Sequence, residues 1–253
     1  MSESITIIDE NKVIDIVLIA GRVLLESGAE TYRVEDTMTR IASSYGLEDT
    51  YSFVTSTAII FSLNDRTNTR LIRVRERTTD LEKIALTNSL SRKIASKSLT
   101  LDEAKAELIH LHHASLQYSF LTQLIAASIA CGFFLFMFGG VKQDFIFAIL
   151  AGAGAFLTFS YVQRFIQIKF FSEFISAAVV VTIAAISYKS GLAVNQDIIT
   201  IAGVMPLVPG ILITNAIRDL MAGELLAGMS RGVEAALTAF AIGAAVAIVL
   251  ILF

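Results

Sequence analysis

The sequence predicts an α-helical membrane protein in which a cytoplasmic α+β domain precedes five transmembrane helices. Of the 253 residues, 55% are hydrophobic and 17% are charged, whereas soluble domains contain about 25% charged residues. The charges gather in residues 1–118, which hold 14 of the 20 Lys and Arg residues and 17 of the 23 Asp and Glu residues. The chain therefore divides into a soluble domain, 1–118, and a transmembrane domain, 119–253.

The soluble domain is predicted to begin with helix. Apolar residues recur at three- and four-residue spacing over residues 10–46, and Ser27-Gly28 interrupts the pattern. Gly46 can provide the left-handed residue that ends the second helical part. We therefore expect two helices with a break at Ser27-Gly28.

Two strands and two further helices are predicted to complete this domain. Residues 51–63 are rich in Thr, Val, Ile and Phe and predict one strand, and Thr69–Arg75 predicts a second. The polar residues 64–68 between them predict a hairpin turn. A helix is expected over residues 81–96, and another is expected to begin near Thr100 and lead into the first span.

Five apolar runs follow, each close to the roughly 20 residues with which a helix crosses a bilayer. The predicted spans are 119–138, 145–163, 170–188, 198–217 and 235–253. Gly228 and Gly232, spaced four residues apart, favour close helix contact before the last span. A single apolar run could be a buried core helix, but five in succession indicate a membrane domain.

Lys and Arg residues near the span ends predict the orientation. They are more frequent before the first span and in the loops after the second and fourth spans than in the loops after the first and third. The N-terminus is therefore predicted to be cytoplasmic, and the odd number of spans places Phe253 on the extracytoplasmic side. The opening residues lack a basic start and a cleavage site, so we expect no signal peptide. The expected location is the plasma membrane, with several passes.

The fourth predicted span contains both prolines, in Gly203-Val-Met-Pro206-Leu-Val-Pro209-Gly210. Each proline removes a backbone donor, so the freed carbonyl groups need protein or water as partners. Secondary transporters build substrate and ion sites at such discontinuous helices, although a plain proline kink is the alternative. Asn215 lies near the end of this span and is a further candidate pathway residue. Arg218 and Asp219 follow the span and are expected to shape the cytoplasmic mouth of a pathway, or simply to mark the membrane interface.

Two acidic residues lie at predicted spans: Glu173 about one turn inside the third, and Glu234 directly before the fifth. A carboxylate there must be protonated or paired, and Arg164, Lys169 or Arg231 are the expected partners. A carboxyl group that loads and releases a proton is what a proton-coupled carrier requires. We therefore expect Glu173 or Glu234 to carry the proton.

Two clusters of basic residues, one of arginines and one of histidines, each allow two interpretations. Arg73, Arg75 and Arg77 would share one face of the second strand, either as a solvated surface or as one that attracts an anion. The three histidines, His110, His112 and His113, could form half of a metal site, but nothing completes it and a solvated helix face is favoured. The single cysteine excludes an internal disulfide, and the net charge of −3 argues against nucleic-acid binding.

Several ordered stretches resemble the threonine/serine exporter family. Residues 24–41 (LLESGAETYRVEDTMTRI) resemble its N-terminal signature, and residues 77–81, 88–92, 206–210 and 215–219 resemble its later blocks. The resemblance covers nearly the whole chain and implies a cytoplasmic N-domain, five spans and proton-driven export of small polar metabolites. The residues on the family's motif positions are Ser27, Gly28, Glu30, Thr31, Arg33, Glu35, Asp36, Asp80, Asn88, Arg92, Pro206, Pro209, Gly210, Asn215, Arg218 and Asp219.

The resemblance also implies a partner. Full-length members of the family continue into a second hydrophobic half, whereas shorter members pair with a separate small membrane protein that supplies it. Threonine/serine-like amino acids are the first expected substrates, and C4-dicarboxylates such as succinate are the alternative. We expect a lipid bilayer around the spans, leave a homo-oligomer open, and expect no cofactor, no metal and no nucleic acid.

An enzyme is the competing class of function. Ser27 or Thr31 would be the nucleophile of a membrane-anchored hydrolase, but a nucleophile needs a base within hydrogen-bond reach. The histidines lie some 80 residues away in the sequence and show no triad context. The sequence therefore predicts no enzymatic activity. A membrane-anchored regulatory module remains a third class.

Overall fold

The computed structural model describes residues 9–63, 69–166, 168 and 170–253. The chain divides into two compact units. The first contains Met1–Gln117 together with Thr214–Gly232, and the second contains Tyr118–Ile213 together with Val233–Phe253. Residues 214–232, which begin at the end of the predicted fourth span, thus belong by their contacts to the N-terminal unit.

The N-terminal unit begins with two helices, as the sequence predicts. They are α1 (Glu10–Glu26) and α2 (Thr31–Ser44). The expected break is confirmed, because Gly28 adopts a φ of +87° between them. Gly46 has a φ of +82° just after α2, which confirms its left-handed conformation.

Two further helices, α3 (Leu81–Ala95) and α4 (Leu101–His113), begin where the sequence predicts, at residue 81 and near Thr100. Asp80 accepts a hydrogen bond from the backbone N–H of Lys83 at 2.9 Å. Thr100 and Glu103 form a reciprocal capping box. Both caps satisfy N–H groups that the first helical turn leaves without partners.

The described strands form an antiparallel sheet in the order β1-β2-β3. They are β1 (Thr50–Val54), β2 (Ala58–Leu63) and β3 (Arg70–Arg73). The single strand predicted over 51–63 is wrong, because Thr55 accepts from the Ala58 N–H through its hydroxyl and closes a tight turn there. Strand β3 also ends two residues earlier than predicted. The turn predicted at 64–68 lies outside the described residues.

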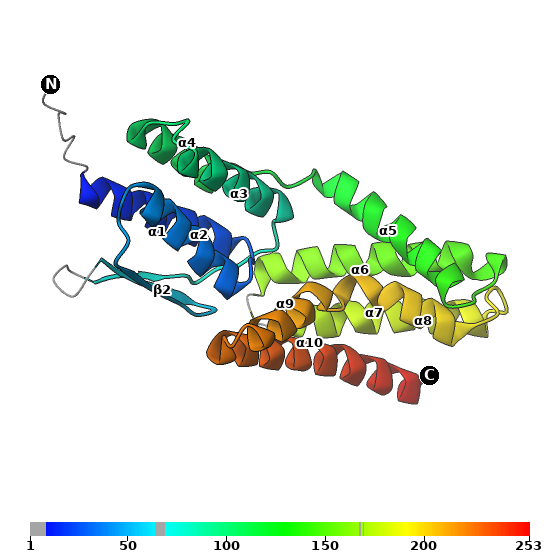
Figure 1. Cartoon of the computed structure of the whole chain (residues 1–253). Helices are drawn as coiled ribbons and strands as arrows, with labels where there is room; N and C mark the ends of the chain where they lie inside the picture. The colour runs from blue at the N-terminus through cyan, green and yellow to red at the C-terminus, as the bar shows by residue number, and fades with distance from the viewer. Residues whose placement is uncertain (1–8, 64–68, 167, 169) are drawn as a thin grey trace, which may run out of the picture. The chain divides into compact units, whose positions relative to one another are not determined.

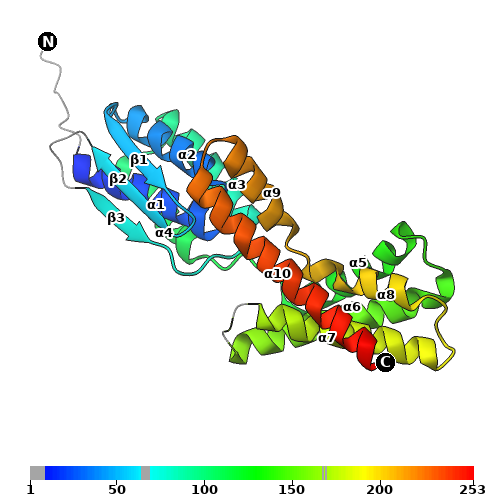
Figure 2. The same ribbon diagram turned by 90° about the horizontal axis from the view of Figure 1, so that it is seen from below.

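The core of this unit lies between the helices and the sheet. α1 packs against α2, α3 and α4 and contacts β2, and α2 contacts β1 (Figures 1 and 2). The buried side chains include Ile16 and Leu24 of α1, Met38 of α2, and Ile59 and Phe61 of β2. Burial of these apolar surfaces is the main stabilising contribution to such a domain.

The second unit contains α5 (Phe120–Met137), α6 (Phe145–Phe165), α7 (Phe171–Lys189) and α8 (Gln196–Val204). Helix α6 contacts α5, α7 and α8 (Figure 1). Its buried residues are small: Ala148, Ala151, Gly152 and Ala155. Small residues let membrane helices approach closely, which explains how α6 contacts three neighbours.

The predicted fourth span is broken at the prolines. Its parts are α8, the short 3-10 helix η2 (Met205–Leu207) and α9 (Gly210–Met221), and the two α-helices are bent by 60°. Within the described residues, four helices are long and apolar enough to cross a membrane, and the bent pair would make a fifth span. The chain is thus mostly helical, with a small sheet.

The last helix, α10 (Leu225–Leu252), begins ten residues before the predicted start at 235. Hydropathy places the boundary after Arg231 and Glu234 because charged residues lower the apolar score. In the structure Arg231 is 3% exposed and has a buried acidic partner, so its charge does not end the helix. The helix therefore extends beyond the N-terminal end of the predicted span 235–253.

Candidate functional site

The connection between α1 and α2 is held in place from the segment before α3. The backbone N–H of Thr78 donates to the Glu26 carbonyl at 2.8 Å, and the N–H of Asp80 donates to the Ser27 carbonyl at 3.0 Å. A Cβ atom on Gly28 would lie 3.1 Å from the Thr78 carbonyl oxygen. A residue with a side chain would be strained at this positive φ and crowded by the Thr78 carbonyl, so the position favours glycine.

Helix α9 supplies three side chains to this connection and to the start of α2. The Asn215 Nδ2 donates to the Gly28 carbonyl at 2.9 Å, and the Arg218 Nη1 donates to Glu30 Oε1 at 2.7 Å. Asp219 Oδ1 accepts from both the backbone N–H and the hydroxyl of Thr31, each at 3.0 Å. Residues three and four apart share a face of a helix, so α9 presents these side chains together.

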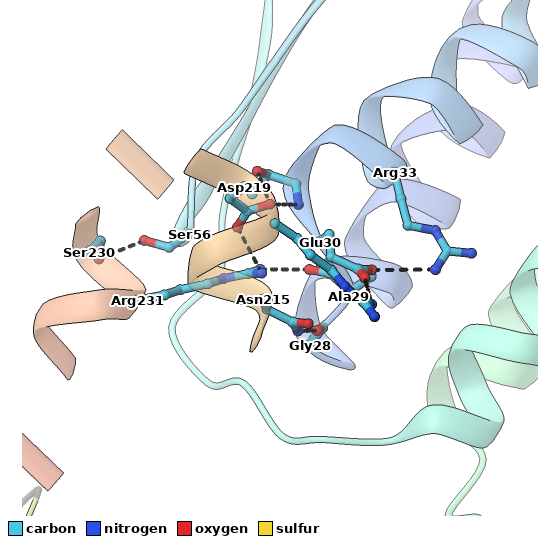
Figure 3. A network of polar contacts seen from close by, with 11 residues as sticks. Gly28, Ala29, Glu30, Arg33, Ser56, Asn215, Asp219, Ser230 and Arg231 are labelled. Atoms are coloured by element: carbon cyan, nitrogen blue, oxygen red, sulfur yellow. Dashed lines mark hydrogen bonds and ion pairs between the residues drawn. The ribbon is translucent and has the colours of Figure 1, made fainter. Parts of the chain in front are cut away.

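Helix α10 contributes the most deeply buried cation of the network. The Arg231 Nη2 donates to the Ala29 carbonyl at 2.6 Å, and its Nη1 lies 2.9 Å from Asp219 Oδ2 as an ion pair. Figure 3 shows Arg231 reaching both Asp219 and the carbonyl of Ala29. The two oxygens of Asp219 thus serve different partners, Thr31 and Arg231.

Asp219 is also placed where the helix dipole favours a negative charge. Thr31 is the first residue of α2, and the residue before it, Glu30, makes no side-chain capping bond. The backbone N–H of Thr31 is one of the donors that α2 cannot satisfy internally. Asp219 accepts from it and stabilises the positive end of the helix from another part of the chain.

Glu30 forms the charged edge of the network. Its side chain is 7% exposed and lies between Arg218 at 2.7 Å and Arg33 at 3.5 Å. Burial alone would raise the pKa of Glu30, but its own backbone N–H and the two arginines outweigh burial and lower the pKa below its ordinary value. Glu30 is therefore held as a carboxylate.

Two further contacts bring α10 close to its neighbours in this unit. The Ser56 hydroxyl, in the turn between β1 and β2, donates to the Ser230 hydroxyl at 3.0 Å (Figure 3). A Cβ atom on Gly228 would lie 2.6 Å from Leu220 Cγ and 3.0 Å from the Ala216 carbonyl oxygen. The absence of a side chain at Gly228 therefore allows α10 to approach α9 closely. The spacing of Gly228 and Gly232 in the sequence favours such a helix contact.

The structure brings some of the predicted site residues together. Those in the network are Gly28, Glu30, Thr31, Arg33, Asn215, Arg218 and Asp219. Ser27 lies directly before it. Other motif residues have local roles: Glu35 accepts from the Val54 N–H, Asp36 pairs with Arg40, and Asp80 caps α3, the helix that also contains Asn88 and Arg92.

The remaining predicted residues lie in the second unit. Pro206, Pro209 and Gly210 form the break between α8 and α9. Glu173 lies in the first turn of α7 and Glu234 in α10, and both side chains are half-buried. Lys169, one of the expected partners, lies outside the described residues.

Sequence reasoning did not find three residues of the network, Ala29, Ser56 and Ser230, nor the pairing of Arg231 with Asp219. Ala29 participates through its carbonyl oxygen, which carries no sequence signal. Arg231 did carry one, because a cation at the start of a long apolar helix requires a partner. The sequence offered Glu173 and Glu234 as that partner, whereas the structure places Asp219 there.

Two of the side chains considered for an enzyme or a metal site, Thr31 and His112, contact other protein groups. Thr31 donates its hydroxyl hydrogen to Asp219 and is fully buried, so no substrate can reach that oxygen in this conformation. His112 Nε2 lies 3.0 Å from Glu26 Oε2. Among the residues that the structure describes, no group of three or more His, Cys, Asp or Glu side chains could hold a metal ion. The network as a whole fastens α9 and α10 to the α1–α2 connection.

Comparison with known proteins gives the family. The family model of threonine/serine exporters matches residues 15–253. A curated protein of Mycobacterium tuberculosis named "Probable threonine/serine exporter" is 26% identical over 229 residues, which are 87% of this chain and 42% of the relative. No solved structure matches the chain significantly. Together with its apolar helices, the match over nearly its whole length indicates a multi-pass membrane protein, and the chain belongs to the threonine/serine exporter family.

Proposed function

We propose that this chain is the membrane subunit of an exporter of small polar metabolites, with threonine- and serine-like amino acids as the first substrates. The family match over residues 15–253 is the observation that carries this proposal. The proposed orientation has the N-terminus in the cytoplasm and Phe253 on the far side of the plasma membrane, following the distribution of Lys and Arg.

A second membrane protein is part of the proposal. The chain spans about two-fifths of the length of the curated relative that it matches, which is 42% covered. We propose a small hydrophobic membrane protein as the partner, following the resemblance to the short members of the family. A C4-dicarboxylate such as succinate is the alternative substrate, as in the short family members that this chain resembles.

The proposed pathway runs along the broken helix at Pro206–Gly210, and Glu173 or Glu234 carries the coupled proton. Pro206 and Pro209 cannot donate backbone hydrogen bonds, and shorter-range bonds take their place: the Met205 N–H donates to the Ala202 carbonyl, and the Val208 N–H donates to the Met205 carbonyl at 3.2 Å. Both glutamates lie in helices apolar enough to span a membrane. An acid in such a helix is a candidate for proton transfer.

The network around Asp219 also acts in this proposal as a mechanical connection. Helix α9 begins at the proline break and carries Asn215, Arg218 and Asp219 into the network. A movement of the α1–α2 connection is thereby transmitted through one continuous helix to the break. That Arg218 and Asp219 also shape the cytoplasmic mouth of the pathway stays a prediction.

Transport by the full chain in sealed liposomes tests the proposal. The chain is reconstituted alone and together with a candidate small hydrophobic membrane protein, and the liposomes are loaded with radiolabelled threonine. We expect release that requires both proteins and a pH gradient and is slowed by unlabelled serine. Parallel liposomes loaded with succinate test the alternative substrate. Absence of release of either compound above protein-free liposomes would overturn the proposal.

An activity assay in detergent distinguishes a transport function from a hydrolase function. A carrier has no measurable activity without two compartments, whereas a hydrolase turns over its substrate in detergent. Hydrolysis of amide or ester substrates by the detergent-solubilised full chain, lost in Thr31→Val, would favour the enzyme instead.

A further inference from the structure

The N-terminal unit contains a cavity of about 550 Å³ that no part of the proposed function uses. Its walls come from α1, from β3 and the segment that follows it, and from the start of α3 and the end of α4. Binding sites for small molecules commonly have volumes of about 300–1,000 Å³. The cavity is therefore large enough for a metabolite-sized ligand.

The charged residues of the cavity are mostly cationic. Arg22, Arg73, Arg75 and Lys83 line it, against two acids, Glu26 and Glu76. Residues 1–118, by contrast, contain 14 basic and 17 acidic residues, so the surrounding domain is slightly acidic. Concentration of one sign of charge in a concave surface focuses the electrostatic potential and attracts ions of the opposite sign.

One of the two acids is already neutralised within the protein. Glu26 Oε1 lies 2.7 Å from the Arg22 Nε, and its Oε2 lies 3.0 Å from the His112 Nε2. The Lys83 Nζ donates to the His112 carbonyl at 3.1 Å. These contacts occupy Arg22, His112 and Lys83 and form one wall of the cavity.

Arg73 and Arg75 stand apart from these contacts. Within the described part of the chain, no ion pair or side-chain hydrogen bond engages either guanidinium, and both side chains are exposed. Arg73 ends β3, and the Val74 N–H donates to the Thr57 carbonyl at 2.8 Å, which keeps the chain extended there. Because side chains alternate along an extended chain, buried Val74 points to the core and its two arginine neighbours point away.

We propose that this cavity binds a small anion carrying two negative charges, with Arg73 and Arg75 as its main ligands. Each guanidinium offers several N–H donors in a planar fork that matches a carboxylate or a phosphate group. Residues two apart on an extended chain lie about 7 Å apart, which is suited to the two ends of a short dianion. The shared chemistry is a pair of anionic oxygen groups.

The position of the cavity gives a bound anion a defined neighbour. Glu26 and Ser27 line it and directly precede the residues that bind α9 and α10. An anion held by Arg73 and Arg75 thus lies against the chain segment that begins the α1–α2 connection. The site is separate from the pathway residues at Pro206–Gly210, and its test does not depend on transport.

Calorimetry on the full chain in detergent at low salt tests the proposal. The probes are malonate for dicarboxylates, inorganic phosphate for phosphate compounds, and acetate as a singly charged control. We expect saturable binding of malonate or phosphate, and affinity for acetate lower by about tenfold or more, since one charge-assisted contact is lost. Which of the two dianions binds more tightly identifies the ligand class.

Substitutions assign the binding to the cavity. The double variant Arg73→Gln/Arg75→Gln is expected to lose about tenfold or more in affinity. Arg70→Gln is the matched control, because Arg70 lies exposed on the same strand and does not line the cavity. Arg73→Lys/Arg75→Lys keeps both charges and should retain part of the affinity, which guards against a folding defect in the glutamine variant. Added NaCl should weaken the binding.

Two results would overturn the proposal. In the first, the wild type, the double glutamine variant and Arg70→Gln bind the dianions with equal affinity. Such a result would place the binding site outside this cavity. The second is absence of saturable binding of both malonate and phosphate to a wild-type chain that unfolds cooperatively. Neither result would bear on threonine export, so failure of this proposal is distinguishable from failure of the proposed function.

Discussion

Asp219 of α9 and Arg231 of α10 form a buried ion pair, with 2.9 Å between Oδ2 and Nη1. Their side chains are 0% and 3% exposed. Each also binds the α1–α2 connection, Asp219 through Thr31 and Arg231 through the Ala29 carbonyl. A single pair therefore joins two consecutive helices to a connection nearly two hundred residues earlier in the chain, and its loss should affect all three.

Replacement of Asp219 by alanine should destabilise the N-terminal unit strongly. The change removes one member of a buried ion pair, which typically costs about 3–5 kcal/mol. Chemical unfolding of the full chain in detergent measures the free energy of unfolding. The control is Asp36→Ala, which removes an exposed pair with Arg40 worth about 0–1 kcal/mol. Equal losses in the two variants would contradict the structural role of Asp219.

The contribution of Glu30 to stability should disappear at acid pH. The pKa of Glu30 is lowered despite its burial, because its own backbone N–H, Arg218 and Arg33 stabilise the carboxylate. The stabilisation is therefore present above the ordinary value of 4.5 and is lost as the pH falls through the lowered pKa. Unfolding temperatures of wild type and Glu30→Gln should differ most near neutral pH and converge in acid. Curves that stay parallel would refute this.

Glu35 should show the opposite pH dependence. Burial raises the pKa of Glu35, the Val54 N–H opposes this, and the charge of Glu224 adds to the rise. A raised pKa means that stability is present below the ordinary value and is lost as the pH rises through the raised pKa. Glu35→Gln removes the charge and keeps an oxygen that accepts from Val54. Its stability relative to wild type should increase as the pH rises, and a constant difference would argue against this assignment.

Substitution of Gly228 should disturb the packing of α10 on α9. A Cβ atom would lie 2.6 Å from Leu220 Cγ and 3.0 Å from the Ala216 carbonyl oxygen. Overpacking of this kind costs about 1–3 kcal/mol, so we expect a lower unfolding temperature for Gly228→Ala. Gly243→Ala, on the same helix, meets no atom within 4 Å and should be neutral or slightly stabilising. Equal behaviour of the two variants would speak against close helix contact at Gly228.

Glu173→Gln tests the proposed proton coupling. The change removes a titratable group from α7 while keeping its size and hydrogen-bonding capacity. If Glu173 carries the proton, release of substrate driven by a pH gradient should collapse in sealed liposomes while membrane insertion is retained. Asp197→Asn is the control, since Asp197 is an exposed acid at the start of α8. Unchanged coupling would give Glu173 a structural role and shift the assignment to Glu234.

The sequence by itself determined those features that depend on near neighbours. Helix breaks and caps arise within a few residues, so Ser27-Gly28, Asp80 and Thr100 were located correctly. The break at Pro206 and Pro209 also follows from local chemistry, because proline cannot donate the backbone hydrogen bond of a helix. The long apolar runs predicted membrane helices because hydropathy sums over adjacent residues.

The tertiary structure decided what depends on residues far apart in the chain. The contact of Arg231 with Ala29 spans 202 residues, and that of Asp219 with Thr31 spans 188. No periodicity encodes such pairs, and burial of Arg231 against Asp219 is also what lets α10 begin at Leu225, before the apolar run. In the same way, the strand pattern shows Arg73 and Arg75 on one face, but the walls of their cavity come from α1, α3 and α4. The sequence gives the charge of each residue, whereas the packing of distant segments decides which partner it has and how far it is buried.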